Sequence, residues 1–282
     1  MKITLAGGDL RSLTAGSLLA KEGYECRGAG FENYKEKADI PFCSCDSGFV
    51  KDSDVLILPL PCLDKDGKTV FAPFSKEKIG LSSLLPSLKK GCFVCGGMMP
   101  FEKENFKDYY SLEDMKIKNA LLTAEGAAAI AITEMKITLF GSKTLVLGYG
   151  RIGKCLAKIL KSLGSDVCAA ARKSEDRAMA EISGMRAADF GSLKEELYKS
   201  DAIFNTVPAR ILSEEELMCI RSGVPLIELA SGAGCADSEE AEKCFVRLIK
   251  APSLPGRFSP VTAGRIIFES VMTLLKERGL AP

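Results

Sequence analysis

The chain has 282 residues, 46% of them hydrophobic, and its 38 lysines and arginines nearly balance its 37 aspartates and glutamates. This length and apolar content favour two globular domains. The balanced charge argues against a nucleic-acid partner, and no apolar run is long enough for a membrane partner. Because the first residues form a predicted strand with no cleavable signal, we expect a cytoplasmic protein.

Histidine is absent, and there are 11 cysteines. The lack of histidine excludes Ser-His and Cys-His nucleophilic chemistry, and also the His–carboxylate pair with which 2-hydroxy acid dehydrogenases move a proton. The cysteines are odd in number and scattered, so we expect most of them to be small apolar residues, and we predict no metal site. The alternative is a four-thiolate zinc site made by Cys43, Cys45, Cys92 and Cys95.

The N-terminal half alternates predicted strands with helical segments. This alternation indicates a parallel sheet with helices on its faces, and such sheets bind ligands at the carboxyl ends of their strands. The predicted strands cover residues 2–6, 24–29, 54–58 and 92–95, and the loops that follow the first, third and fourth of them cover 7–11, 59–61 and 96–99.

Asp9 and Arg11 lie in the loop after the first predicted strand. There Arg11 could clamp a carboxylate group of a substrate, and Asp9 could orient that substrate or act as a base. The alternative is that Asp9 caps the following helix while Arg11 is exposed to solvent. The sequence leaves both interpretations open.

A long helix is predicted at residues 121–140, with Thr123 as its N-cap. Glu125 then lies in the least polar part of the start of this helix, where a desolvated carboxyl group could serve in proton transfer. The alternative is that Glu125, as the second helical residue, only interacts favourably with the helix dipole.

The strongest motif lies at residues 143–153, where a buried strand leads into a glycine-rich turn and then a helix. This is the context that the dinucleotide-binding fingerprint requires. Gly148 permits the tight turn, Gly150 lets the backbone approach a pyrophosphate, and Gly153 lets the helix pack on its strand. Arg151 and Ile152 begin the helix, whose free N–H groups face the phosphates. The motif predicts binding of a nicotinamide dinucleotide.

The second strand of this half, predicted at 166–171, ends at Arg172, Lys173 and Ser174. NAD-binding proteins usually place a carboxylate there for the ribose 2′-OH, whereas a cation suits the 2′-phosphate of NADP. We therefore expect NADP as the cofactor, with NAD as a possibility. The alternative is that Arg172 and Lys173 are solvated residues of a loop.

Four more strands are predicted at 185–187, 201–205, 225–229 and 245–249, which completes a six-stranded doubly wound domain. The ends of the fourth and fifth strands flank the nicotinamide in this fold. This placement makes Thr206, Val207, Pro208, Ala230 and Ser231 candidate cofactor contacts. The alternative is that Thr206–Pro208 only ends a strand, because proline cannot continue a central ladder.

A proline- and glycine-rich connector at 251–264 leads into a last helix, with Ser259 as N-cap and Pro260 as first residue. We expect this helix to return to the N-terminal domain. The predicted architecture is α/β: two Rossmann-like, doubly wound parallel-sheet domains with a ligand cleft between them. The predicted N-terminal domain comprises 1–130 and 259–282, and the dinucleotide-binding domain comprises 131–258.

Together these motifs resemble the family of the dipicolinate synthase A subunit, found in spore-forming bacteria. The resemblance implies an oxidoreductase that makes dipicolinate from a dihydrodipicolinate-type precursor with NADP or NAD, for sporulation. It also implies a small dicarboxylate substrate, a flavoprotein-like B subunit that acts as partner, and roles for Asp9 and Arg11 in holding substrate and for Glu125 or Asp9 in proton transfer. The motifs that carry it are Gly7-Gly8-Asp9-x-Arg11, Thr123–Ala127, Leu145–Gly153 with Ala171-Arg172, Asn205–Pro208, and Ala251–Gly256 with Pro260–Gly264.

Two other functions remain open at this stage. One is an NADP-dependent dehydrogenase of another small carboxylic acid, although the absence of histidine disfavours the hydroxy acid branch. The other is a non-catalytic NADP-binding subunit that regulates a partner. Either could be a homo-oligomer.

Overall fold

The computed structural model describes residues 1–46, 48–101, 103–232 and 234–281. The chain forms two compact units, one made of Met1–Asn119 with Ser259–Pro282 and the other of Ala120–Phe258, which we call unit 1 and unit 2. The predicted division at residue 130 falls inside helix α3 (Glu113–Glu134), which contributes residues to both units. No helix in the described ranges combines the length and apolarity needed to cross a membrane.

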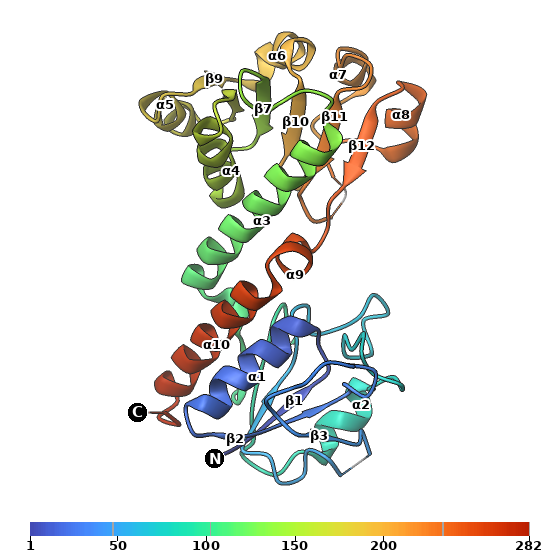
Figure 1. The fold of residues 1–282 in the computed structure, drawn as a ribbon, viewed down its shortest axis with the longest axis vertical. Helices are drawn as coiled ribbons and strands as arrows, with labels where there is room; N and C mark the ends of the chain where they lie inside the picture. The colour runs from blue at the N-terminus through green and yellow to red at the C-terminus, as the bar shows by residue number, and fades with distance from the viewer. Residues whose placement is uncertain (47, 102, 233, 282) are drawn as a thin grey trace. The chain divides into compact units, whose positions relative to one another are not determined.

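Unit 1 contains a six-stranded parallel sheet in the order β3-β2-β1-β4-β5-β6; its strands β1, β2 and β3 are labelled in Figure 1. Its central strand, β1, pairs with β2 on one side and β4 on the other, so the carboxyl ends of these strands meet at one edge. Because β3 and β6 are only short edge strands, they carry too little hydrophobic alternation to be predicted from sequence. The strands are β1 (Lys2–Ala6), β2 (Glu25–Ala29), β3 (Phe42–Cys43), β4 (Val55–Ile57), β5 (Phe93–Gly96) and β6 (Phe106–Asp108).

Helices α1 (Leu10–Lys21) and α10 (Pro260–Glu277) lie side by side in unit 1 (Figure 1). They approach closely because α10 has a glycine at the contact: a Cβ atom on Gly264 would lie 2.6 Å from the carbonyl oxygen of Arg11 and 2.5 Å from the Cβ of Thr14. The predicted return of the last helix to the N-terminal unit is therefore confirmed. Shorter helical segments of this unit are α2 (Leu81–Leu84), η1 (Leu85–Ser87) and η2 (Tyr109–Ser111).

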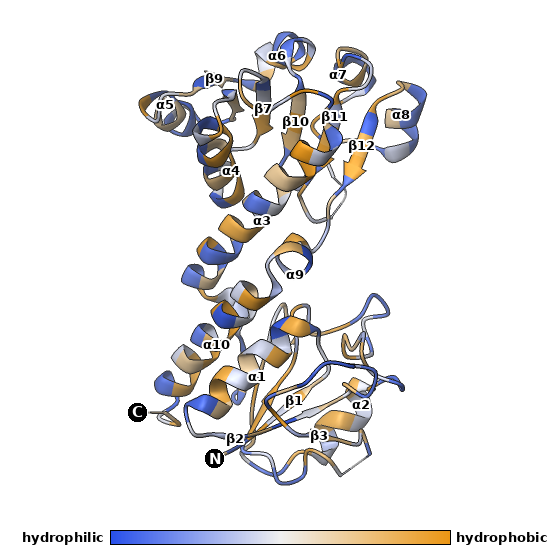
Figure 2. Cartoon of the chain, in the orientation of Figure 1, coloured by the Kyte–Doolittle hydropathy of each residue, from blue (hydrophilic) through white to orange (hydrophobic). Residues whose placement is uncertain are grey.

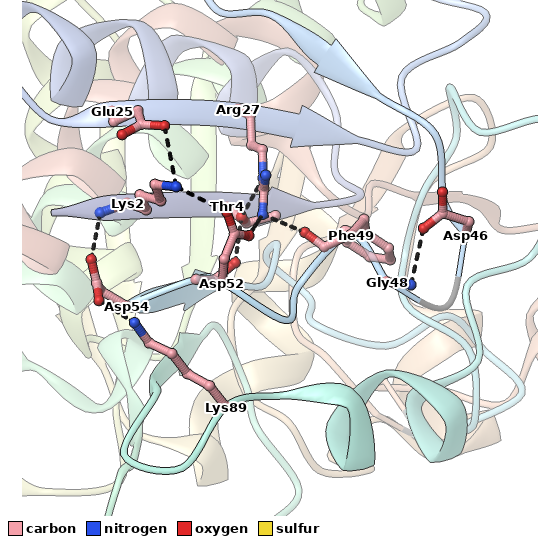
Figure 3. Close-up of polar contacts among 11 residues, drawn as sticks. Lys2, Thr4, Glu25, Arg27, Asp46, Gly48, Phe49, Asp52, Asp54 and Lys89 are labelled. Atoms are coloured by element: carbon pink, nitrogen blue, oxygen red, sulfur yellow. Dashed lines mark hydrogen bonds and ion pairs between the residues drawn. The ribbon is translucent and has the colours of Figure 1, made fainter.

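A charged network covers part of the sheet in unit 1 (Figure 3). The Arg27 guanidinium donates to the Thr4 hydroxyl at 3.1 Å and to the Phe49 carbonyl at 2.6 Å, and it also pairs with Asp52. Lys2 donates to the other oxygen of Asp52 at 3.1 Å. These two cations, Arg27 first, lower the pKa of Asp52 to about 2. The network ties β1 and β2 to the loop before β4.

Unit 2 contains a second six-stranded parallel sheet, in the order β12-β11-β10-β7-β8-β9. The order reverses between β7 and β10, which is the topological switch point of a doubly wound fold. The strands are β7 (Lys143–Leu147), β8 (Asp166–Ala170), β9 (Arg186–Ala188), β10 (Ala202–Asn205), β11 (Pro225–Glu228) and β12 (Arg247–Lys250).

Helices cover both faces of this sheet, and the central strands are apolar on both sides (Figure 2). Val146 and Phe204 pack toward α3, α4 and α5, whereas Leu145, Leu147 and Ile203 pack toward α6, α7 and α8. The predicted fold class, two Rossmann-like α/β sheets, is confirmed. The remaining helical segments are α4 (Arg151–Ser162), α5 (Ser174–Ile182), η3 (Phe190–Ser192), α6 (Leu193–Lys199), α7 (Glu214–Met218), α8 (Ser238–Lys243) and α9 (Leu254–Phe258).

Helix α3 corrects one prediction. It begins at Glu113 rather than near residue 121, and it ends at Glu134. Glu113 and Asp114 place acidic side chains in its first turn, where they favour the helix dipole. Thr123 is consequently an interior helical residue and not an N-cap, and Glu125 is not in the first turn.

Candidate cofactor and substrate sites

The three glycines of the fingerprint have the three geometries that a dinucleotide cradle needs. Gly148 has φ +94°, and a Cβ there would lie 2.5 Å from the Thr206 hydroxyl oxygen. Gly150 is the N-cap of α4, and a Cβ there would meet nothing within 4 Å. A Cβ on Gly153 would lie 2.1 Å from the carbonyl oxygen of Gly148. The turn is thus tight, its middle is open, and its helix packs closely on β7, which fits a bound pyrophosphate.

The helix that follows begins at Arg151, with Ile152 and Gly153 completing the first turn. No side chain caps its N-terminus. Because the N-cap residue is a glycine, which has no side chain to cap the helix, the backbone N–H groups of this turn are suited to phosphate oxygens.

The residues after β8 are arranged as a basic turn that leads into α5. Arg172 and Lys173 are exposed, and Ser174 is the first residue of α5. Lys173 lies 3.9 Å from Glu175, whereas no carboxylate of the described chain pairs with Arg172. The backbone of this turn is held by the Arg177 guanidinium, which donates to the carbonyl oxygen of Arg172 at 2.8 Å. An unpaired guanidinium beside a helix N-terminus suits a phosphate.

The loop after β10 is fixed by two side chains. The Thr206 hydroxyl donates to the Leu147 carbonyl at 2.9 Å, which joins this loop to the end of β7. The Asn205 side chain is fully buried, and its Oδ1 accepts from the Val207 N–H at 3.0 Å while its Nδ2 donates to the Val207 carbonyl at 2.9 Å. Pro208 follows as an exposed residue. The loop is rigid where the nicotinamide is expected.

Glu228, the last residue of β11, is a functional candidate that the sequence analysis did not identify. Its side chain is 8% exposed, and it accepts hydrogen bonds from Asn205 Nδ2 at 2.7 Å, Ala230 N at 2.9 Å and Cys235 N at 2.7 Å. These bonds hold the loop that carries Ala230, which is half-buried, and Ser231, which is exposed. The sequence signal that could have identified Glu228 is a single glutamate in the otherwise apolar predicted strand 225–229.

In unit 1, Asp9 and Arg11 form one compact ion pair at the carboxyl end of β1. Arg11 Nε donates to Asp9 Oδ1 at 2.9 Å and Nη2 donates to Oδ2 at 2.8 Å, and Asp9 also caps α1 by accepting from the Arg11 N–H at 3.0 Å. Arg11 is only 6% exposed. Its Nη1 has no hydrogen-bond partner among the described residues. Asp9 is thus a cap, as one interpretation held, but Arg11 is buried rather than exposed.

The loops after β4 and β5 adjoin this pair. A Cβ on Gly8 would lie 3.2 Å from the Cβ of Pro59, and the Gly97 N–H donates to the Pro59 carbonyl at 3.0 Å. The three loops chosen from the sequence therefore lie at one edge of the sheet, where a ligand of unit 1 is expected.

Two other predictions concern the Glu125 carboxyl group and the four-cysteine zinc site. Glu125 is exposed, so the expectation of a desolvated carboxyl group is wrong. The zinc alternative gains no support, because no group of three potential metal ligands occurs in the described part of the chain, and Cys45 instead donates to Glu32 at 3.4 Å.

Two family models match this chain, and they meet close to the boundary between unit 1 and unit 2. Residues 2–117 match the N-terminal domain of the dipicolinate synthase A subunit, and residues 119–240 match the NAD-binding domain of D-isomer specific 2-hydroxyacid dehydrogenases. The fold, the glycine cradle and this second match define the class: the protein is an NAD(P)-dependent oxidoreductase.

Individual relatives narrow the assignment. The chain is 29% identical to the dipicolinate synthase A subunit of Bacillus subtilis (strain 168), over 98% of this chain and 96% of the relative. The crystal structure of the Bacillus halodurans A subunit superposes with a TM-score of 0.89 at 28% identity, covering 97% of both chains. A transhydrogenase of Sinorhizobium meliloti, at 17% identity and a TM-score of 0.74 over 99% of this chain and 95% of that one, shares the fold. The resemblance to the dipicolinate synthase A subunit is confirmed.

Proposed function

We propose that this protein is the oxidoreductase subunit that forms dipicolinate by removing a hydride and a proton from a dihydrodipicolinate-type precursor, with NADP⁺ as the preferred acceptor. The main support is Arg11, whose buried guanidinium is held by Asp9 and whose Nη1 has no hydrogen-bond partner among the described residues. This residue lies in a chain whose similarity to a dipicolinate synthase A subunit extends over 98% of its length.

The substrate is a dianion, so it needs fixed cations. Because both carboxylate oxygens of Asp9 are already hydrogen-bonded to Arg11, the guanidinium cannot rotate freely, and Nη1 is presented to one carboxylate of the substrate. Arg265, an exposed residue of α10 in unit 1, is a candidate for the second carboxylate. A nicotinamide cofactor, when bound, would supply the hydride acceptor. Positioning the ring carbon is the main task of the protein, since formation of an aromatic ring already favours the reaction.

Asp9 is better suited to positioning than to proton transfer. Its two oxygens accept from Nε, Nη2 and the backbone N–H of Arg11, so both are already occupied in holding the guanidinium and capping α1. Water is therefore the proposed acceptor of the proton. The chain has no histidine that could accept it.

NADP⁺ is preferred over NAD⁺ because of the turn after β8. Arg172 has no carboxylate partner in the described residues, and a 2′-phosphate would provide one. The candidates for the remaining contacts are the glycine cradle for the pyrophosphate and Thr206, Val207, Pro208, Ala230 and Ser231 for the nicotinamide half.

The proposed partner is a B subunit, because the relatives are named as A subunits. A second candidate function is oxidation of another small acid, which the match to 2-hydroxyacid dehydrogenases favours. The lack of histidine argues against hydroxy acids as those substrates.

The test is a spectrophotometric assay of NADP⁺ reduction with the dihydrodipicolinate precursor, with and without the B subunit. Reduction of NADP⁺ with this substrate supports the proposal. Reduction with another small acid alone supports the second candidate. Binding of NADP⁺ without turnover of any acid, even when the B subunit is present, contradicts a catalytic role.

A further inference from the structure

Glu228 carries a buried negative charge for which the proposed reaction has not yet been given a use. The groups that hydrogen-bond to its oxygens are all donors: Asn205 Nδ2 and the backbone N–H groups of Ala230 and Cys235. The direction of the Asn205 amide is fixed, since its Oδ1 must accept from the Val207 N–H. None of these groups needs the Glu228 carboxyl group to donate in return.

No ion pair neutralises this carboxylate among the described residues, and its nearest cation in the sheet register is Lys250, the partner of Glu228 on β12. No lysine or arginine of the described ranges lies within ion-pair distance of Glu228, and the side chain is 8% exposed. Neutral N–H dipoles spread the charge but do not cancel it, so a negative potential persists around the ends of β10 and β11.

The position of Glu228 in the fold places its charge on the side of the sheet where the nicotinamide half of the cofactor is expected. The sheet order reverses between β7 and β10, the glycine cradle follows β7, and the basic turn follows β8. The adenosine half of the cofactor belongs to that side of the switch point, which leaves the ends of β10 and β11 to the nicotinamide half. The nicotinamide ring is a cation when oxidised and neutral when reduced.

We propose that Glu228 is a specificity-determining residue that favours binding of the oxidised over the reduced cofactor through its buried charge, which no ion pair neutralises. This inference rests on the proposed function, in which the protein must bind NADP⁺ and release NADPH. The hydrogen bonds of Glu228 to Asn205 and to the loop after β11 fix the charge in place, and they also position the two loops that are candidate contacts of the ring.

The test measures binding rather than turnover. Wild type, Glu228→Gln, Glu228→Asp and Asn205→Ala are titrated calorimetrically with NADP⁺, NADPH and 2′-phospho-ADP-ribose, which lacks the nicotinamide. We expect Glu228→Gln to lose roughly fivefold to tenfold in affinity for NADP⁺ relative to NADPH, as removal of one unit charge at moderate distance predicts. Its affinity for 2′-phospho-ADP-ribose stays within twofold of wild type. Glu228→Asp keeps the wild-type preference.

Asn205→Ala is the control for loop positioning. It removes one hydrogen bond to Glu228 and both bonds to Val207 but leaves the charge, so it weakens NADP⁺ and NADPH alike. An unchanged NADP⁺ to NADPH ratio in Glu228→Gln, or an equal loss for all three ligands, overturns the inference and leaves the proposed function standing. If Glu228→Gln does not fold, the affinities of the wild-type protein still test the inference. Tighter binding of NADPH than of NADP⁺ by the wild type contradicts it. Failure of wild type to bind any of the three ligands overturns the proposed function itself.

Discussion

An ideal Cβ atom on Gly153 would lie 2.1 Å from the carbonyl oxygen of Gly148. That oxygen is backbone and cannot move aside without distorting the turn between β7 and α4. We therefore expect Gly153→Ala to lower the free energy of unfolding of unit 2 by about 1–3 kcal/mol, the usual range for overpacking, and to abolish dinucleotide binding. Thermal unfolding with and without NADP⁺ measures both effects.

Gly150→Ser is the matched control for the same turn. Gly150 is the N-cap of α4 with no atom near its virtual Cβ, and serine is a favourable N-cap residue. We expect the melting temperature to stay at the wild-type value or rise, while affinity for NADP⁺ falls because the side chain occupies the space of the pyrophosphate. Undiminished NADP⁺ binding by both variants would remove this turn from the cofactor site.

The NADP⁺ preference is predicted to depend on Arg172. Replacing Arg172 with Asp removes a charge-assisted contact to the 2′-phosphate and adds a repulsive charge, so the preference for NADP⁺ over NAD⁺ should fall roughly 10-fold to 100-fold. The measurement is the ratio of dissociation constants for the two cofactors. Lys243→Asp, on α8 beside β12, makes the same change of charge and should leave that ratio unaltered. A ratio unchanged in Arg172→Asp argues for a solvated loop.

Substrate binding is predicted to depend on Arg11. Arg11→Ala removes the open Nη1 donor, so kcat/KM for the dicarboxylate should fall roughly 10-fold to 100-fold, while affinity for NADP⁺ changes less than twofold. Steady-state kinetics and calorimetry together make this test. Lys21→Ala, an exposed residue in the last turn of the same helix, is the control and should behave as wild type. Equal rates for Arg11→Ala and wild type would exclude Arg11 from the site.

Much of unit 2 could be predicted because its signals are local. The glycine spacing from Gly148 to Gly153 and the apolar strands on both sides of it depend on neighbouring residues alone. In helix α3, the helical signal in the sequence comes from the small apolar residues after Leu121, whereas the first turns from Glu113 are polar. The predicted start of the helix therefore lies about one-third of the way along the helix that the structure shows.

The polar interactions of the sites depend on contacts between distant segments. The Asn205–Glu228 hydrogen bond joins two strands 23 residues apart and has no signature in either segment. The burial of Arg11 is hidden from the sequence for a related reason. Pairing with Asp9 is local, but the close approach of α10 over the Arg11 backbone brings together residues from the two ends of the chain. For the same reason the exposure of Glu125 could not be decided from helical periodicity.

Acid stability is predicted to involve the network around Asp52. Hydrogen bonds from Arg27, then Lys2, lower the pKa of Asp52 from 3.8 to about 2 in the folded state. A depressed folded-state pKa gives stabilisation that is present above about pH 4 and is lost as the pH falls toward 2. Asp52→Asn should therefore melt below wild type at pH 7, and the difference should shrink at the acid end of this range.

Asp39→Asn controls for the loss of an exposed carboxylate, since the one ion pair of Asp39 among the described residues is a 3.9 Å contact with Lys21. It should melt within a degree or so of wild type at both pH values, as expected for a weak surface pair. A difference between Asp52→Asn and wild type that stays constant from pH 7 to the acid limit would show that the network contributes through packing and not through its charges.

The proposed function requires this protein to oxidise a dihydrodipicolinate-type precursor to dipicolinate while a nicotinamide cofactor is reduced. The most direct measurement mixes the purified protein, its B subunit, the precursor and NADP⁺, and quantifies NADPH by absorbance and dipicolinate by chromatography in the same sample. We predict that the two products accumulate in equal amounts and that Arg11→Ala suppresses both. Dipicolinate that forms at the same rate without NADP⁺ or without this protein, or NADPH that forms without dipicolinate, would contradict the claim.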